Sequence, residues 1–176
     1  MTTNEPRADG GLDGGTGPVA DGGASGLSVV VAVSGTDAPR AELLAEAVAD
    51  LAGPLLDEVY ITQVFTPEEF DAAVERLNFD PDAPPEPAAV ARRSAAVRAI
   101  SDLLEDAVDA GTTSIDVRGA VTDDVGEAIV DLAADVGADR ILVGGRKRSP
   151  AGKAVFGSTA QHVLLNADQP VTFVRE

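Results

Sequence analysis

Apolar positions recur along this chain with two different periods, and the two periods alternate. Short apolar runs rich in β-branched residues predict five strands, over residues 28–33, 59–65, 114–119, 140–143 and 171–174. Apolar residues at helical spacing predict four main helices, over about 38–52, 88–110, 124–136 and 157–166. A Pro-punctuated connection over residues 66–87 leaves room for a short helix at about 68–77.

Strands that alternate with helices form right-handed β-α-β units, so the pattern predicts an α/β fold. We expect an open five-stranded parallel sheet sandwiched by helices, Rossmann-like, with strand order 3-2-1-4-5. In such sheets ligands bind outside the carboxyl ends of the strands, where the strand order reverses. Any ligand site is therefore expected at the predicted strand ends, which are residues 34–36, 63–65, Gly119 and 144–147.

The beginning of the chain differs in composition from the rest. Residues 1–26 hold eight of the 18 glycines and almost no large apolar side chain, so ordering them would cost backbone entropy without burying apolar surface. We expect a disordered tail over residues 1–26. Residues 27–176 are expected to form one domain, since about 150 residues is a usual size for a single core.

The formal net charge is −17, from 30 acidic and 13 basic side chains, of which only two are lysine. Nucleic acids and anionic membranes are bound through Lys and Arg, so neither is an expected partner of this acidic surface. The chain has no cysteine, which excludes disulfides and thiolate metal sites, and its one histidine gives no basis for a metal site. The start lacks an apolar signal region and no run approaches the roughly 18 apolar residues of a membrane span, so we expect a cytoplasmic protein. Acidic excess with scarce lysine is also typical of proteins from a salty cytoplasm, where salt screens self-repulsion.

The positive charge is concentrated beside one predicted strand end. Residues 1–145 carry 8 basic and 28 acidic side chains, whereas residues 146–176 carry 5 basic and 2 acidic ones. Most of these five lie in the loop that follows the fourth strand, namely Arg146, Lys147, Arg148 and Lys153. The overall charge therefore excludes large polyanions but allows one small anion in one crevice.

The same segment contains the parts of a phosphate site. Phosphate binding needs glycine where the backbone must approach the ligand closely, and a helix N-terminus with free N–H groups. These parts are supplied by Gly144, Gly157, Ser158 and Thr159. The segment is not a Walker A loop, because Gly152-Lys153 is followed by Ala154 and Lys147 stands where the first glycine of that motif belongs.

Three motifs in order resemble the universal stress protein family. Gly144-x-x-Lys147, nine further residues and Gly157-Ser158 resemble its nucleotide signature G-x2-G-x9-G-[ST], with Lys147 in place of the second glycine. Residues 31–36, VAVSGT, resemble its A-V-D-G-[ST], with Ser34 in place of the aspartate. Residues 166–171, NADQPV, resemble its H-A-x-x-P-V. The resemblance covers roughly residues 27–176.

This resemblance implies that the chain binds an adenine nucleotide, ATP or alternatively AMP or ADP, and that any Mg²⁺ would come with the nucleotide. The site residues that it implies are Ala32, Val33, Ser34, Thr36, Val64, Gly144, Lys147, Gly157, Ser158 and Thr159. The phosphates and ribose would lie against the glycine motif, and the nucleoside against the end of the first strand, with Val64 beside the base. The resemblance further implies a homodimer through the final strand, a role in stress response and an unidentified protein partner.

Several alternatives remain open. Lys147 either blocks the close backbone approach or meets a phosphate with its ammonium group. Ser158 and Gln161 have the spacing of a helix capping box, which would explain Ser158 without any ligand. An alternative function is a dimeric interaction module of the same fold that binds no nucleotide. A slow ATPase ranks last, because the sequence offers no identifiable general base or water-positioning residue.

Overall fold

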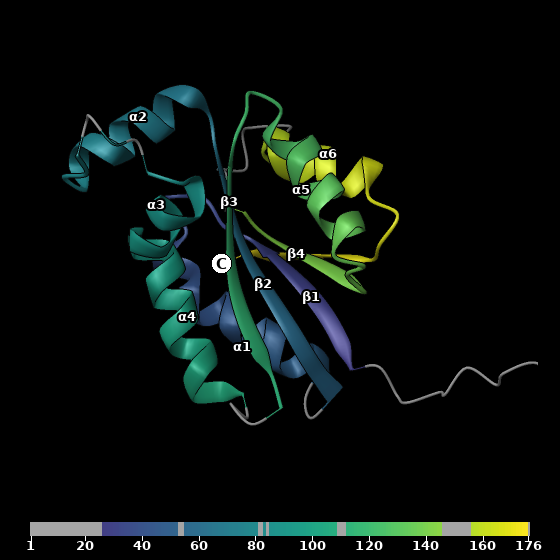
Figure 1. The fold of residues 1–176 in the computed structure, drawn as a ribbon. Coiled ribbons are helices and arrows are strands. Elements are labelled where there is room, and N and C mark those ends of the chain that lie inside the picture. Colours follow the sequence, from purple (N-terminus) through teal and green to yellow (C-terminus); the bar gives the residue numbers. More distant parts are fainter. Residues whose placement is uncertain are drawn as a thin grey trace, which may run out of the picture.

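The computed structural model of the chain is shown in Figure 1 and describes residues 26–52, 55–80, 83, 85–108, 112–145 and 156–175. Residues 1–25 of the expected tail lie outside this part. So do Lys147 and the other basic side chains of the loop after the fourth strand.

The centre of the fold is a parallel sheet. Its strands are β1 (Leu27–Ala32), β2 (Leu56–Phe65), β3 (Ser114–Val121), β4 (Arg140–Gly145) and β5 (Val171–Arg175). The strand order is β3-β2-β1-β4-β5, which confirms the predicted sheet and its order. In the central register Ala32 lies beside Thr62 of β2 and beside Val143 of β4. The strand order therefore reverses between β1 and β4, where the carboxyl ends of these two strands are neighbours.

Helices cover both faces of the sheet. They are a 3-10 turn η1 (Ala38–Arg40) followed by α1 (Ala41–Ala52), α2 (Pro67–Arg76), α3 (Pro87–Arg93), α4 (Ala95–Ala107), α5 (Val125–Asp135) and α6 (Ser158–Asn166). Figure 1 shows α1, α3 and α4 on one side of the sheet and α5 and α6 on the other. Within the described ranges, no helix is both long and apolar enough to cross a bilayer.

The period of two along β1 divides the core into two clusters. Val29 and Val31 pack with α1 and α4, whereas Val30 and Ala32 pack with α5 and α6. Val30 and Val31 are completely buried, as expected for the central strand of a sheet that is covered on both faces.

The long helix predicted over residues 88–110 is wrong, because α3 and α4 are separate helices. Ser94 lies between them with extended backbone (φ −69°, ψ 144°) and is buried, with 5% of its surface exposed. Its hydroxyl accepts a hydrogen bond from the backbone N–H of Val97 at 3.3 Å, so Ser94 is the N-cap of α4. The apolar pattern continues through Ser94 because this side chain faces the core.

Candidate functional site

The candidate site lies between the carboxyl ends of β1 and β4, where the strand order reverses, and is called the crevice below. The connections from β1 and β4 run to opposite faces of the sheet, since α1 follows β1 and α6 follows β4. In open α/β sheets this arrangement leaves a crevice that can hold a ligand. Beyond the paired residues Ala32 and Val143, the crevice is bordered by the loop that begins at Ser34 and by Gly144.

A buried carboxylate organises the loop after β1. Asp37 is 3% exposed, and its Oδ2 atom accepts hydrogen bonds from the Ser34 N–H at 2.7 Å and from the Ser34 hydroxyl at 2.9 Å. Its Oδ1 atom pairs with the guanidinium group of Arg40, which is 4% exposed. Ser34 and Thr36 are themselves exposed, and their hydroxyl oxygens lie 2.9 Å apart. The loop therefore has a buried, paired charge beneath an exposed rim of hydroxyl groups.

The same carboxylate explains why a glycine, Gly144, stands one residue before the end of β4. A Cβ atom at Gly144 would lie 3.2 Å from Oδ1 of Asp37. A side chain there would have to displace a charged group that is already paired with Arg40. Gly144 thus lets Asp37 bridge the two sides of the crevice, which is a structural reason for this glycine that does not depend on a ligand.

The first turn of α6 is open. Gly157 is the N-cap, with φ −72° and ψ 163°, and within the part of the chain that the structure describes no side-chain hydrogen bond caps this end of the helix. The alternative that Ser158 and Gln161 form a capping box is therefore wrong, because Ser158 is already the first residue of the helix. Gly157 and Ser158 are exposed, Thr159 is half-buried, and no atom of the described residues lies within 4 Å of a Cβ atom built at Gly157. An uncapped helix N-terminus at the carboxyl edge of a sheet is suited to an anion.

The apolar residues named for the nucleoside are divided between the two faces of the sheet. Ala32 and Val64 are buried in the core cluster that lies under α5 and α6. Val33 is buried in the opposite cluster, and its N–H donates to the carbonyl oxygen of Thr62 at 2.8 Å. A ligand on the α6 side of β1 would therefore meet the side chains of Ala32 and Val64 but only the backbone of Val33.

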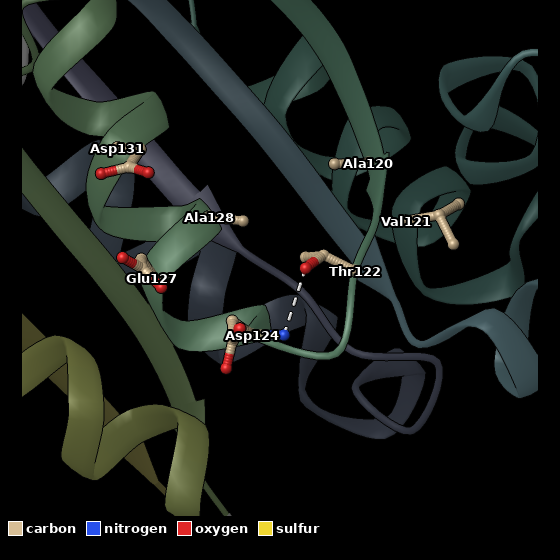
Figure 2. Close-up of a pocket in the computed structure, with 7 residues that line it drawn as sticks. All are labelled: Ala120, Val121, Thr122, Asp124, Glu127, Ala128 and Asp131. Atoms are coloured by element: carbon tan, nitrogen blue, oxygen red, sulfur yellow. Dashed lines mark hydrogen bonds between the residues drawn. The ribbon is translucent and has the colours of Figure 1, made fainter.

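A hollow lies at the end of β3, and Figure 2 shows the residues around it. Its volume is about 280 Å³, and it is lined by Ala120, Val121, Thr122, Asp124, Glu127, Ala128 and Asp131. The hydroxyl oxygen of Thr122 accepts a hydrogen bond from the N–H of Asp124 at 3.2 Å. Ala120 is the register partner of Val64, so this hollow adjoins the same carboxyl edge as the crevice.

The sequence analysis missed both this hollow and the Asp37–Arg40 pair. Asp124, Glu127 and Asp131 have the i, i+3 and i+7 spacing of one helix face, which is a signal for the acidic wall. Ser34-x-x-Asp37 has the [ST]-x-x-[DE] spacing of a capping box, in which the acidic side chain accepts from the N–H three residues earlier, and this spacing is a signal for the turn. Among the described residues, no group of three or more His, Asp or Glu side chains is placed to hold a metal ion.

Known proteins share this fold. A universal stress protein from Archaeoglobus fulgidus is 28% identical and superposes with a TM-score of 0.53, covering 84% of this chain and 98% of its own. UspA from Lactobacillus plantarum is 19% identical with a TM-score of 0.57, covering 85% of this chain and 97% of its own. A universal stress protein solved in complex with cAMP is 24% identical with a TM-score of 0.54, covering 86% of this chain and 98% of its own. No curated protein sequence matches. The sequence model of the universal stress protein family matches residues 28–175, so this chain belongs to the universal stress protein family.

Proposed function

We propose that this protein binds an adenine nucleotide, ATP or its mono- or diphosphate, in the crevice between β1 and β4. The observation that carries the proposal is the glycine-capped first turn of α6, which follows the glycine end of β4 at the point where the strand order reverses. A relative of the same fold has been solved with cAMP, so an adenine nucleotide is the ligand class that we favour. In this role the protein is a cytoplasmic regulator whose bound nucleotide sets its affinity for a protein partner.

The chemistry of the described residues fits such a ligand. The first-turn N–H groups of α6, at Ser158 and Thr159, would take the phosphates, since a helix N-terminus carries partial positive charge. Ala32 and Val64 would offer apolar contact to the base, and Thr36 a polar contact to the nucleoside. The ammonium group of Lys147, outside the described residues, would add positive charge beside the phosphates. Mg²⁺ would be held by the phosphates.

The direct test is to identify any nucleotide released from the purified protein by mass spectrometry, and then to titrate the stripped protein with ATP at high salt. We expect release of an adenine nucleotide or saturable binding. Absence of both, up to millimolar ATP, would refute the proposal.

A single substitution at Gly157 tests the location of the site. We predict that Gly157→Val abolishes nucleotide binding, because its branched side chain would stand over the open turn of α6. The fold is expected to persist, since a Cβ atom there meets no atom of the described residues within 4 Å and φ is −72°. Gly157→Ala is the matched control and is expected to weaken binding less. Wild-type affinity in a folded Gly157→Val protein would place the nucleotide elsewhere.

The second candidate is a dimeric interaction module without a nucleotide. It is favoured by β5, an edge strand whose Val171, Phe173 and Val174 are half-buried within a single copy. Edge strands of this kind can pair with a second copy and bury their apolar side chains. Light scattering of the full chain, combined with the ATP titration described above, separates the candidates, because a dimer that binds no nucleotide supports only the second. We propose the homodimer through β5 in both cases.

A further inference from the structure

A chain of hydrogen bonds runs from the exposed rim of the crevice to a buried charge. Thr36 and Ser34 are exposed, and their hydroxyl oxygens lie 2.9 Å apart. The Ser34 hydroxyl lies 2.9 Å from Oδ2 of Asp37, and Asp37 pairs with Arg40. Asp37 and Arg40 are 3% and 4% exposed, so the inner end of this chain is shielded from water.

The buried charge sets the direction of these hydrogen bonds. A carboxylate paired with a guanidinium group is ionised and only accepts hydrogen bonds. The Ser34 hydroxyl must therefore donate its single proton to Asp37. The contact between Ser34 and Thr36 then needs the proton of Thr36, so Thr36 donates to Ser34. The outermost atom of the chain, Oγ1 of Thr36, is left with lone pairs only.

The position of Asp37 holds this arrangement in place on both sides of the crevice. Its carboxylate accepts the Ser34 N–H at 2.7 Å, which fixes the start of the loop. It also fills the space left by the missing side chain at Gly144, where a Cβ atom would be 3.2 Å away. The two hydroxyl groups are thus oriented by a carboxylate that is hydrogen-bonded to the loop after β1 and occupies the space beside Gly144 of β4.

We propose that Asp37, held by Arg40, is a positioning residue that makes Thr36 an obligate hydrogen-bond acceptor, so that this rim binds a donor group of the nucleotide. This inference rests on the proposed function. The donor is a ribose hydroxyl or the exocyclic amine of adenine, which share the required chemistry. A phosphate oxygen is rejected at this position, because it offers no proton to an oxygen atom that presents only lone pairs.

Titration calorimetry with four nucleotides tests the assignment: AMP, 2′-deoxy-AMP, 3′-deoxy-AMP and inosine monophosphate, which lacks the exocyclic amine. In the wild-type protein, the analogue without the contacting donor is expected to bind about tenfold more weakly than AMP. Thr36→Val removes the acceptor at nearly constant volume, so AMP and that analogue should then bind equally. Thr36→Ser keeps the oxygen and should keep the difference. One analogue should bind more weakly than AMP to the wild-type protein but as tightly as AMP to Thr36→Val. The group that this analogue lacks is the donor.

The role of Asp37 is tested by the ratio of the affinity for AMP to the affinity for the analogue that lacks the contacting donor. A residue with a merely structural role would not change this ratio. Asp37→Asn introduces an amide N–H that can donate to Ser34, so the ratio of AMP to analogue affinity should shrink. The double variant Asp37→Asn, Arg40→Gln removes both buried charges together and covers the case in which the single variant does not fold. The inference is overturned if Thr36→Val leaves every affinity unchanged, or if a folded Asp37 variant retains the full ratio. If the wild-type protein binds none of the four nucleotides, the proposed function fails and this inference fails with it.

Discussion

The glycines of this chain differ in how much space surrounds their missing side chains. At Gly119, in β3, a Cβ atom would lie 2.4 Å from the backbone carbonyl carbon of Pro87 and 2.5 Å from the backbone nitrogen of Ala88. The start of α3 therefore rests directly on β3. At Gly35, in the loop after β1, the nearest atom is the flexible amide nitrogen of Gln63 at 3.7 Å, which is ordinary contact.

We predict that Gly119→Ala lowers the free energy of unfolding by about 1–3 kcal/mol, because backbone atoms of α3 must move to make room. Urea unfolding followed by circular dichroism measures this change. Gly35→Ala is the matched control and should be neutral or stabilise by about 0.4–1 kcal/mol, since it reduces the freedom of the unfolded chain without a clash. Equal effects of the two substitutions would contradict the close contact between α3 and β3.

Tyr60 is the only tyrosine of the chain, so its ionisation can be followed without interference. Its pKa is raised above 10.0, first by burial, then by the hydrogen bond that its hydroxyl donates to Glu58 at 3.1 Å and by the charge of Glu58. The charge of Arg118 lowers the pKa and that of Asp116 raises it, both to a smaller extent.

The raised pKa of Tyr60 predicts a loss of stability in alkali. The folded protein retains the phenol proton at a pH where the unfolded chain releases it. This contribution to stability is fully present below pH 10.0 and disappears as the pH rises through the higher folded value. The ultraviolet absorbance of tyrosinate should titrate at higher pH in the native protein than in concentrated urea. Glu58→Gln should reduce the difference, and a native midpoint at or below the value in urea would contradict it.

Ser94 determines where one helix ends and the next begins. We predict that Ser94→Ala lowers the free energy of unfolding by about 0.5–2 kcal/mol, because the N–H of Val97 loses its acceptor in a buried environment. Thermal or urea unfolding measures the loss. Ser101→Ala, in the body of α4, is the control and should change stability by no more than about 0.5 kcal/mol. A similar loss in both variants would mean that the cap contributes nothing specific.

Among the elements, the strands and the layer order were predictable from apolar periodicity, whereas the break at Ser94 was not. A central strand such as β1 is buried on both faces, so its run of valines indicates a buried strand from the sequence alone. Ser94 occupies a core-facing position in the apolar stripe, and its extended ψ leaves no trace in that pattern. The start of β2 at Leu56 was also missed, because Asp57 and Glu58 interrupt the apolar run.

The candidate site was predictable only where it depends on local sequence. The motif residues lie at strand ends and at a helix start, as their spacing indicates. The contact between Asp37 and Gly144 depends instead on β1 and β4 being neighbours, which joins residues more than 100 positions apart. The division of Val33 and Val64 between the two faces follows from the period of two, but only once the register of β1 and β2 is known.

For the molecule as a whole, the dominant electrostatic feature is self-repulsion. The formal net charge is −17, and runs of exposed carboxylates such as Glu68, Asp71 and Glu75 lie along single helices. Exposed charges of one sign destabilise a compact state, and salt weakens their repulsion. The Asp37–Arg40 pair differs from these groups, because it is buried and is screened much less by salt.

We therefore predict that the melting temperature rises as KCl is raised from about 0.1 M to about 1 M, over which the screening length falls from about 10 Å to about 3 Å. Each kcal/mol of repulsion relieved should raise it by about 2–4 °C for a chain of this size. The triple variant Glu68→Gln, Asp71→Asn, Glu75→Gln has less repulsion along α2, so its melting temperature should depend less on KCl. Differential scanning calorimetry measures the melting temperature of the wild-type protein and of the triple variant at each KCl concentration. General salt effects act equally on the two proteins, so a difference in their salt dependence reports screening of the charges on α2. Identical salt dependence would show that the acidic charge of α2 does not oppose folding.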